Sequence, residues 1–460
     1  MKAIGSSRVL AILNLSIATM CPAQILVEPA HEAVFRKAFN TNSNAKPLEC
    51  AVTPVRPALD FSLRFHAGFL IDLPLSQFRG PHHAAITLLR VSPESGVPAY
   101  LASYTRFPDG STMSAYGHIQ GGFAVGEGKY KVEVLVKDDL DRTCRNQWFI
   151  NAKPDRSERG VRLALRPLTV AGLSSAAISS TLATNQMNFD RLTILVHVEP
   201  PSPHLTTLPA SDARKLLGSL SALLEQLHAR SVRLILFNLE QQKVLFRKDG
   251  STAADVEGVA RVISQTRFGL VDYATFRNPS GAMNLLARLT EDELGQLHSS
   301  DGLIFLGPHV RAHGALPAGV GTQPRDGARV FYLKCAPPLS LFTEANDSGP
   351  RITAASATVP AQTLEDDGAE DIDYADHFSA LNQSDNIRAA NAYDASDLDQ
   401  QDGIDRLVRR LKGKTIFIRK PGDCARAIRL ITQREGRREN LQAEETMAGL
   451  NFTESRSMTH

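Results

Sequence analysis

Two short motifs in this chain have residue types and spacings that could bind a metal or a phosphate, and each lacks a residue that this chemistry requires. His309 and His313 are spaced like two zinc ligands on one helical face, but Arg311 lies between them and the glutamate of His-Glu-x-x-His is missing. The segment Lys412–Thr415 resembles the end of a phosphate-binding loop, but Val408 stands where the first glycine is required. The sequence therefore predicts neither zinc nor nucleotide binding.

The acidic stretch Asp397–Gly403 resembles a calcium loop only in part. Its third acidic residue comes one position late, and Val408 is near the position that needs a bidentate glutamate. We expect no more than weak, nonspecific screening by calcium there. The sequence contains no Gly-x-Ser-x-Gly elbow and no recognisable serine or cysteine nucleophile with an assembled base. These motifs predict no catalytic residues, no cofactor and no bound metal.

The first residues have the organisation of a secretory signal peptide. Lys2 and Arg8 precede the apolar run Val9–Met20, and small residues precede a cut after Ala23; a cut after Ala18 is the alternative. Residues 1–23 are therefore expected to be removed on export to the periplasm, the cell envelope or the medium. No later segment is long and apolar enough to span a bilayer, so we expect no membrane span in the mature chain.

Removing this leader leaves four cysteines, which fall into two pairs along the chain. Cys50 and Cys144 bracket one region, whereas Cys335 and Cys424 belong to a later one. In an oxidising compartment the simplest expectation is one disulfide within each region. The alternative is four buried thiols that pack as small apolar side chains.

Length and composition exclude some classes of protein. A chain of 460 residues that is 43% hydrophobic and 22% charged can form two domains with cores, so it is neither disordered nor a small disulfide-stapled scaffold. A net charge of +2 argues against a strongly basic nucleic-acid binder. This small net charge conceals two blocks: residues 344–405 carry about 15 acidic side chains, and residues 406–439 about 12 basic ones.

Residues 46–168 have the pattern of short strands and turns that is typical of an all-β, Ig-like sandwich. Short strand-like runs are separated by turn signals such as Pro108-Asp109-Gly110, and apolar residues alternate at period two. A serine- and alanine-rich linker is expected over 169–188. The expected strands are Leu59–Phe65, Ala84–Val91, Tyr130–Lys137, Gln147–Ala152 and Gly160–Leu168.

After this linker, strand and helix patterns alternate. Leu192–Val198 is a nearly continuous apolar run, typical of a strand that is covered on both faces, and leucines recur at helical spacing over Ser211–Ala229. The pattern predicts a Rossmann-like α/β domain with a mostly parallel sheet over 190–338 and 401–434. The acidic residues 343–400 are predicted to be a disordered insertion, and 440–460 a disordered tail.

The second region resembles the von Willebrand factor A-type domain, in particular the divergent VWFA-related proteins that acidobacteria export. The resemblance covers about 190–431 and rests on the opening strand Leu192–Val198, the strand pair within 231–246, and the closing segment Arg406–Thr415. A β-rich module before the domain is also similar to the arrangement in that family.

The resemblance implies a divalent-cation site at the carboxyl end of the sheet, made by Asp-x-Ser-x-Ser, a threonine and a later aspartate. In this chain His197, Glu199 and Pro201 occupy the first three positions, Gly307 replaces the aspartate, and Thr275 is the candidate threonine. Hard cations require oxygen ligands. These degenerate positions therefore predict that metal binding has been lost.

The resulting expectation is an exported, non-enzymatic adhesion or binding protein that acts on an unidentified protein partner and not on nucleic acid. The competing class is an envelope hydrolase, or another enzyme, whose loops at the carboxyl ends of the strands would use His197, Glu199 and Asp272. A third hypothesis is salt-sensitive binding of acidic polymers by the basic residues near Arg406.

Overall fold

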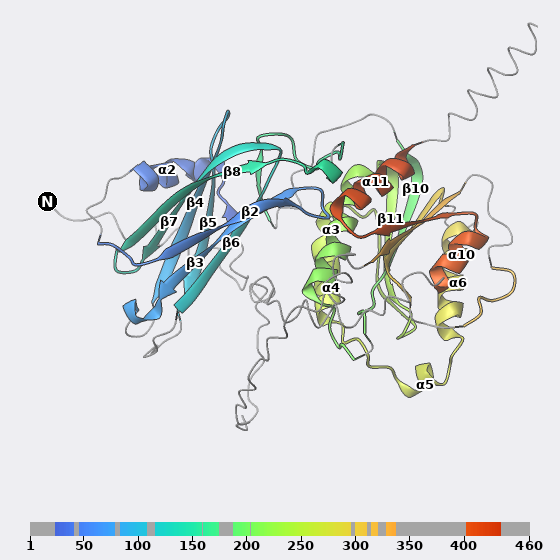
Figure 1. Ribbon diagram of the computed structural model, residues 1–460. Helices are drawn as coiled ribbons and strands as arrows, with labels where there is room; N and C mark the ends of the chain where they lie inside the picture. Colours follow the sequence, from blue (N-terminus) through green and yellow to red (C-terminus); the bar gives the residue numbers. More distant parts are fainter. Residues whose placement is uncertain are drawn as a thin grey trace, which may run out of the picture.

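The computed structural model describes residues 24–40, 46–78, 83–107, 116–158, 160–173, 187–202, 204–295, 300–310, 314–320, 328–336 and 402–433. These residues form two units that contain three β-sheets (Figure 1). The first unit comprises residues 24–173 and the second comprises residues 187–433. The expected signal peptide (1–23), acidic insertion (343–400) and tail (440–460) lie outside the described residues.

The first unit consists of two antiparallel sheets, with strand orders β1-β5-β4-β7-β8 and β2-β3-β6-β9. Its helical elements are short. The strands are β1 (Ile25–Leu26), β2 (Ala51–Leu59), β3 (Phe65–Pro74), β4 (Ala84–Pro93), β5 (Ala99–Arg106), β6 (Tyr116–Val125), β7 (Gly128–Asp138), β8 (Thr143–Ala152) and β9 (Val170–Gly172). The helices are η1 (Pro29–His31), α2 (Glu32–Asn40), η2 (Leu75–Gln77) and η3 (Arg156–Glu158).

Strand β7 illustrates how the period-two pattern builds the first core. Tyr130, Val132, Val134 and Val136 all point into the space between the two sheets and are at most 1% exposed. Each such valine contributes about 1.5–3 kcal/mol relative to an exposed side chain. On the opposite face of the strand, Leu135 is buried in a smaller cluster to which helix α2 contributes.

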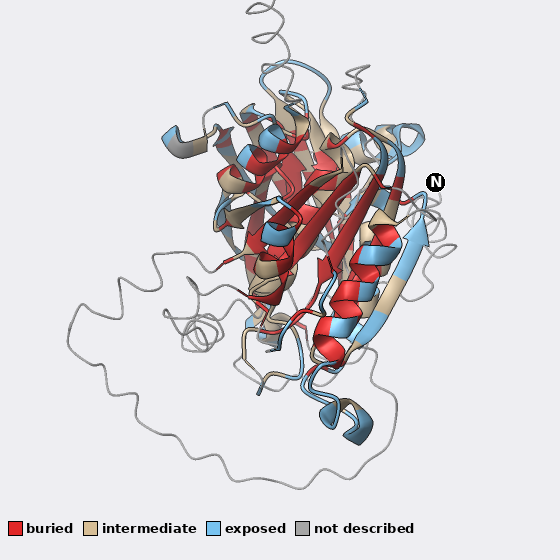
Figure 2. Cartoon of the chain, turned by 90° about the vertical axis from the view of Figure 1, so that its right-hand side faces the viewer, coloured by how far each residue is buried: buried red, intermediate tan, exposed pale blue. Residues whose placement is uncertain are grey.

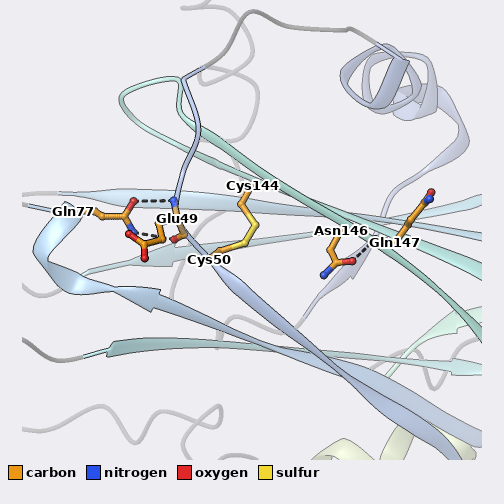
Figure 3. Close-up of a disulfide and its surroundings, with 6 residues drawn as sticks. All are labelled: Glu49, Cys50, Gln77, Cys144, Asn146 and Gln147. Carbon is orange, nitrogen blue, oxygen red and sulfur yellow. Dashed lines mark hydrogen bonds between the residues drawn. A yellow bond between two sulfur atoms is a disulfide. The ribbon is translucent and has the colours of Figure 1, made fainter.

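A disulfide joins the two sheets of this first unit. Cys50 directly precedes β2, and Cys144 lies in β8 of the other sheet, with 6.2 Å between their Cα atoms (Figure 3). The Gln77 side chain stabilises the backbone beside the disulfide, because its amide donates to the Glu49 carbonyl and its oxygen accepts from the Glu49 N–H, each at 2.9 Å. The first of the two expected cysteine pairs is therefore present.

Replacing both Cys50 and Cys144 with serine should lower the free energy of unfolding by about 2–4 kcal/mol. The bond closes a loop of 94 residues and so restricts the unfolded chain. Urea unfolding of the purified protein measures this change. Wild-type protein treated with a reductant should match the double variant, and identical midpoints for oxidised and reduced wild type would contradict the prediction.

The second unit is built on one six-stranded sheet with the order β12-β11-β10-β13-β14-β15. β10 pairs in parallel with β11 and β13, β14 pairs in parallel with β13 and β15, and β12 is antiparallel to β11. The strands are β10 (Phe189–His197), β11 (Ala229–Asn238), β12 (Lys243–Asp249), β13 (Gly302–Pro308), β14 (Arg329–Cys335) and β15 (Lys414–Ile418).

Helices cover both faces of this sheet. Helices α3, α4 and α11 share a core with Ile194 and Val196 of β10, whereas α6 and α10 share a core with Leu195 on the opposite face. Figure 2 shows the central strands buried between these layers. The helices are α3 (Ala210–Gln226), η4 (Ala253–Asp255), α4 (Val256–Gln265), α5 (Tyr273–Phe276), α6 (Gly281–Leu294), α10 (Gly403–Arg410) and α11 (Pro421–Thr432).

The predicted fold class, which combined an Ig-like sandwich with a Rossmann-like domain built on a mostly parallel sheet, is wrong. Most strands of the described chain lie in the two antiparallel sheets, and the third sheet is mixed. The turn between Asn238 and Lys243 is too short for the crossover that a parallel neighbour needs, so β12 returns antiparallel beside β11. Apolar content alone could not reveal this direction.

Other sequence predictions failed locally in the first unit. The expected strand Leu59–Phe65 is the turn between β2 and β3, and the expected strand Gly160–Leu168 has no regular structure. The unit also extends beyond the predicted 46–168, because β1 and α2 precede this range and β9 lies in the predicted linker 169–188.

The turn between β2 and β3 forms the junction between the two units (Figure 1). Asp60 Oδ1 accepts from the backbone N–H and the hydroxyl of Ser62, which fixes the turn, and Leu63 has a φ of 60°. Leu63 is fully buried in the core of the second unit. Arg64 donates to Glu225 of α3 at 2.6 Å, and the side chains of this pair are only 6% and 9% exposed. The two units thus share a core and a buried ion pair.

His66 makes the stability of this junction depend on pH. Burial lowers the pKa of His66 below its ordinary 6.5, and Arg64 and Arg214 lower it further, although Asp60 opposes them. The unfolded chain therefore binds this proton more readily than the folded chain, so stability falls as the pH drops below about 6.5. Urea midpoints between pH 7.5 and 5.5 should decrease more for wild type than for His66→Gln. Parallel decreases would contradict the expectation.

Candidate functional site

The parallel strands of the second unit all end at one edge of their sheet, which brings five chain segments together. These strands end at His197 (β10), Asn238 (β11), Pro308 (β13), Cys335 (β14) and Ile418 (β15). The Asn238 side chain links the end of β11 to the end of β10, because its amide donates to the Val198 carbonyl at 2.6 Å. Side chains that follow these strands can therefore act together at this carboxyl edge.

His197 and Glu199 meet at the carboxyl edge but are closed off from solvent. The imidazole Nε2 of His197 lies 3.3 Å from Oε2 of Glu199, and the two side chains are 0% and 2% exposed. The ring of His197 also packs against Phe237, with 5.3 Å between ring centroids. Because both side chains are buried at the carboxyl edge, we interpret them as a pair that stabilises the structure.

A small cavity lies beside Glu199. Its lining includes Asp212 and Lys215 of α3 and Cys335 of β14, and its volume is about 20 Å³, room for about one water molecule. Lys215 is buried and donates to the Ala336 carbonyl at 2.8 Å, which holds the ammonium in place. Such a cavity cannot enclose an organic substrate, since ligand pockets are more than tenfold larger.

Cys335 and Cys424 are free thiols, so the second expected disulfide is not present. Burial raises the pKa of each thiol to about 12, and for Cys335 the nearby Lys215 only partly opposes this. Disulfide formation proceeds through a thiolate, which burial disfavours here. The same shift makes Cys335 a poor nucleophile at neutral pH. The two cysteines contribute apolar packing instead.

Thr275, the candidate threonine of the degenerate cation site, lies apart from the buried pair. It is part of the short helix α5, where its N–H donates to Oδ1 of the helix-capping Asp272 at 2.7 Å. Asp272 is exposed and is paired with Lys243 at 3.7 Å. The predicted residues His197, Glu199 and Thr275 therefore do not form one constellation, and Asp272 does not join the pair as the enzyme hypothesis requires.

The residues at the degenerate cation positions do not fit a hard divalent ion. His197 offers a nitrogen packed against a ring, and a Cβ at Gly307 would meet the His197 carbonyl oxygen at 2.5 Å, so no aspartate side chain fits there. Within the described residues, no group of three or more His, Cys, Asp or Glu side chains is arranged to hold a metal. His309 of the zinc-like motif lies 3.5 Å from Asp402. His313 lies outside the described residues.

Three exposed apolar side chains lie on α5 or directly before it, and sequence reasoning missed them. We call Leu270, Tyr273 and Phe276, which are 66%, 73% and 78% exposed, the α5 patch. The Arg277 guanidinium lies over the Tyr273 ring, 5.5 Å from its centroid. A sequence signal was present, since three large apolar residues recur at a spacing of three within a polar segment.

Two glutamines attach the α5 patch to the carboxyl edge. Gln241, in the turn after β11, donates to the carbonyls of Arg267 and Leu270 at 2.7 and 3.1 Å. Gln242 donates to the carbonyls of Thr275 and Asn278 at 3.2 and 2.8 Å. The side-chain amides of the two glutamines thus bind backbone carbonyls of the loop that carries the patch. These hydrogen bonds hold the loop in a defined position relative to the turn after β11.

Comparison with known proteins assigns no family to this chain. No family model matches it, and no curated protein matches it. Among solved structures, it is similar to a hypothetical protein from Pyrococcus horikoshii OT3, with 16% identity, a TM-score of 0.18, and coverage of 24% of this chain and 93% of that one. A Bacteroides uniformis beta-glucuronidase gives 7% identity, a TM-score of 0.16, and coverage of 62% and 33%. Likenesses this weak support no functional argument.

Proposed function

We propose that this chain is an exported, non-enzymatic protein-binding protein and that the α5 patch is its main contact surface. The observation that carries the proposal is the exposure of three large apolar side chains on a loop with a defined position. Such side chains are costly to leave in water and are enriched where proteins bind one another. Kinship with the exported VWFA-related proteins remains a hypothesis from the sequence segments alone.

The patch suggests the chemistry of its partner. Arg267 and Arg277 are exposed beside the apolar side chains. Asp272 is paired with Lys243, so within the described part of the chain the two arginines give this surface its positive charge. The fitting partner is therefore a protein with an apolar recess bordered by carboxylates, because tyrosine and arginine anchors bind most strongly in such desolvated settings.

Two further observations support export and binding over catalysis. The Cys50–Cys144 disulfide is typical of proteins that mature in an oxidising compartment. The cavity beside Glu199 has room for about one water molecule, which disfavours the hydrolase alternative. No helix among the described residues has the length and apolar character to cross a membrane.

The test uses a triple variant, Leu270→Ser with Tyr273→Ser and Phe276→Ser, in the mature chain. Envelope and secreted proteins of the source organism are passed over immobilised protein, and the retained proteins are identified by mass spectrometry. The control is Phe149→Ser, which removes an aromatic side chain that is 78% exposed on β8, far along the chain from the patch.

A protein retained by wild type and by Phe149→Ser, but lost from the triple variant, supports the proposal. Because the patch side chains are exposed, each substitution should change the free energy of unfolding by no more than about 0.5 kcal/mol relative to wild type. If wild type and the folded triple variant retain the same proteins, the α5 patch is not the contact surface.

A further inference from the structure

A second cluster of charged side chains is buried between β14 and α10, and the proposed binding function does not use it. Lys334 Nζ lies 3.0 Å from Oδ2 of Asp405 and 3.3 Å from Oδ2 of Asp402. The three residues are 1%, 5% and 4% exposed. Charged side chains are almost never buried to this extent without a particular role or compensation.

The surroundings give the two aspartates different roles. Asp402 accepts N–H bonds from Asp405 at 2.7 Å and from Val310 at 3.2 Å, and the Tyr332 hydroxyl also donates to it at 3.2 Å. Asp405 instead points Oδ2 at Lys334, while its Oδ1 accepts the Thr415 hydroxyl at 2.7 Å. One carboxylate is thus held in place as a base, and the other is oriented toward the amine.

We propose that Lys334 and Asp405 condense to form an intramolecular isopeptide bond. The Lys334 ammonium first passes a proton to the Asp405 carboxylate, which leaves a neutral amine and a neutral acid. Nζ then attacks Cγ of Asp405 and forms a C–N bond. Asp402 accepts a second proton from Nζ and returns it to the departing hydroxyl, so that a C–O bond breaks and one water molecule leaves. Nothing is oxidised or reduced, and Asp402 ends as it began.

Three features of the cluster favour this condensation. The ion pair holds Lys334 Nζ 3.0 Å from Oδ2 of Asp405, so the amine is kept beside the carboxyl group whose carbon it would attack. Exclusion of water from the cluster opposes the reverse reaction, hydrolysis of the bond. The aromatic ring of Phe417, whose centroid is 5.7 Å from Nζ, further screens the site from solvent.

The chain provides a control pair of the same residue types. Lys137 Nζ lies 2.7 Å from Oδ1 of Asp141, but the side chains are 47% and 71% exposed. Both pairs are therefore in direct contact, but the exposed pair lacks the burial and the second carboxylate of the Lys334 cluster. We expect no bond between Lys137 and Asp141.

The experiment is mass spectrometry of wild-type mature chain, intact and after complete trypsin digestion in denaturant. The intact mass should be lower than the sequence mass by one water molecule, beyond the two hydrogens lost in the disulfide. Because trypsin does not cleave after a modified lysine, residues 330–351 and 389–406 should appear as one branched peptide. An intact mass without this loss, together with a free peptide 330–334, overturns the proposal.

Two variants test the role of the nucleophile and the role of the proton acceptor separately. Lys334→Met should restore the full mass because the nucleophile is gone. Asp402→Asn keeps both reacting residues and the shape of the helix cap, and should reduce the cross-linked fraction at least tenfold. An undiminished fraction in Asp402→Asn would overturn the assigned role of Asp402. The wild-type mass shows whether the isopeptide bond is present even if a variant fails to fold. This result does not depend on whether the α5 patch binds a partner.

Discussion

Arg64→Met is expected to lower the free energy of unfolding by about 3–5 kcal/mol, because it leaves Glu225 as a buried carboxylate without its cation. The Arg64–Glu225 pair joins the turn of the first unit to helix α3 of the second, so its loss weakens the junction. Methionine preserves most of the apolar stem of arginine, and the measured change therefore reports on the charge. Urea unfolding of the mature chain provides the measurement.

Two further variants serve as controls for the effect of Arg64→Met on stability. Arg64→Met with Glu225→Leu removes both charges and should recover most of the lost stability, because replacing a buried ion pair as a whole costs little. Arg230→Met removes a cation from the Arg230–Asp190 pair, whose side chains are 77% and 71% exposed, and should change stability by less than about 1 kcal/mol. An Arg64→Met effect no larger than that of Arg230→Met would show that the junction pair is not important for stability.

Gly307→Asp, which restores the aspartate of the degenerate cation site, is expected to destabilise the protein by about 3–5 kcal/mol. The new Cβ would lie 2.5 Å from the His197 carbonyl oxygen, and such overpacking alone costs about 1–3 kcal/mol. Gly307 is buried, so the added carboxylate would also be taken out of water. Added Mg²⁺ should not rescue the variant, since His197 supplies no oxygen ligand.

The control for Gly307→Asp is Gly258→Asp in helix α4. A Cβ at Gly258 would meet no atom within 4 Å, and an acidic side chain near a helix start is favourable. This substitution should be neutral or slightly stabilising in thermal unfolding. If Mg²⁺ raised the unfolding temperature of Gly307→Asp selectively, the cation site would be recoverable and our view of its geometry would be wrong.

Local periodicity identified many elements correctly. The alternation from Tyr130 to Val136 is the inward face of β7, and the leucine repeat expected over Ser211–Ala229 is helix α3, which runs from Ala210 to Gln226. These predictions succeed because each pattern is satisfied within one element. The direction of β12 was not predictable in this way, since it depends on the length of a turn and on pairing with a neighbour.

The junction shows why a regular pattern can mislead. Leu59, Phe61, Leu63 and Phe65 alternate as in a half-buried strand, but Asp60 binds the backbone of Ser62 and Arg64 and turns the chain. Leu63 is apolar because it enters the core of the second unit, which no periodicity within the first unit can indicate. The sequence could place His197 and Glu199 at a strand end, but not their burial.

The burial of Leu63 has a consequence for the modularity of the protein. Multidomain chains are commonly regarded as exchangeable parts that can be moved between proteins without loss. Residues 187–433 on their own would lose Leu63 from their core, together with the packing of Phe61 and Val161, and would leave Glu225 without Arg64. The turn between β2 and β3 is thus structurally part of the second unit, and a duplication or transfer of that unit would need to carry this distant turn with it.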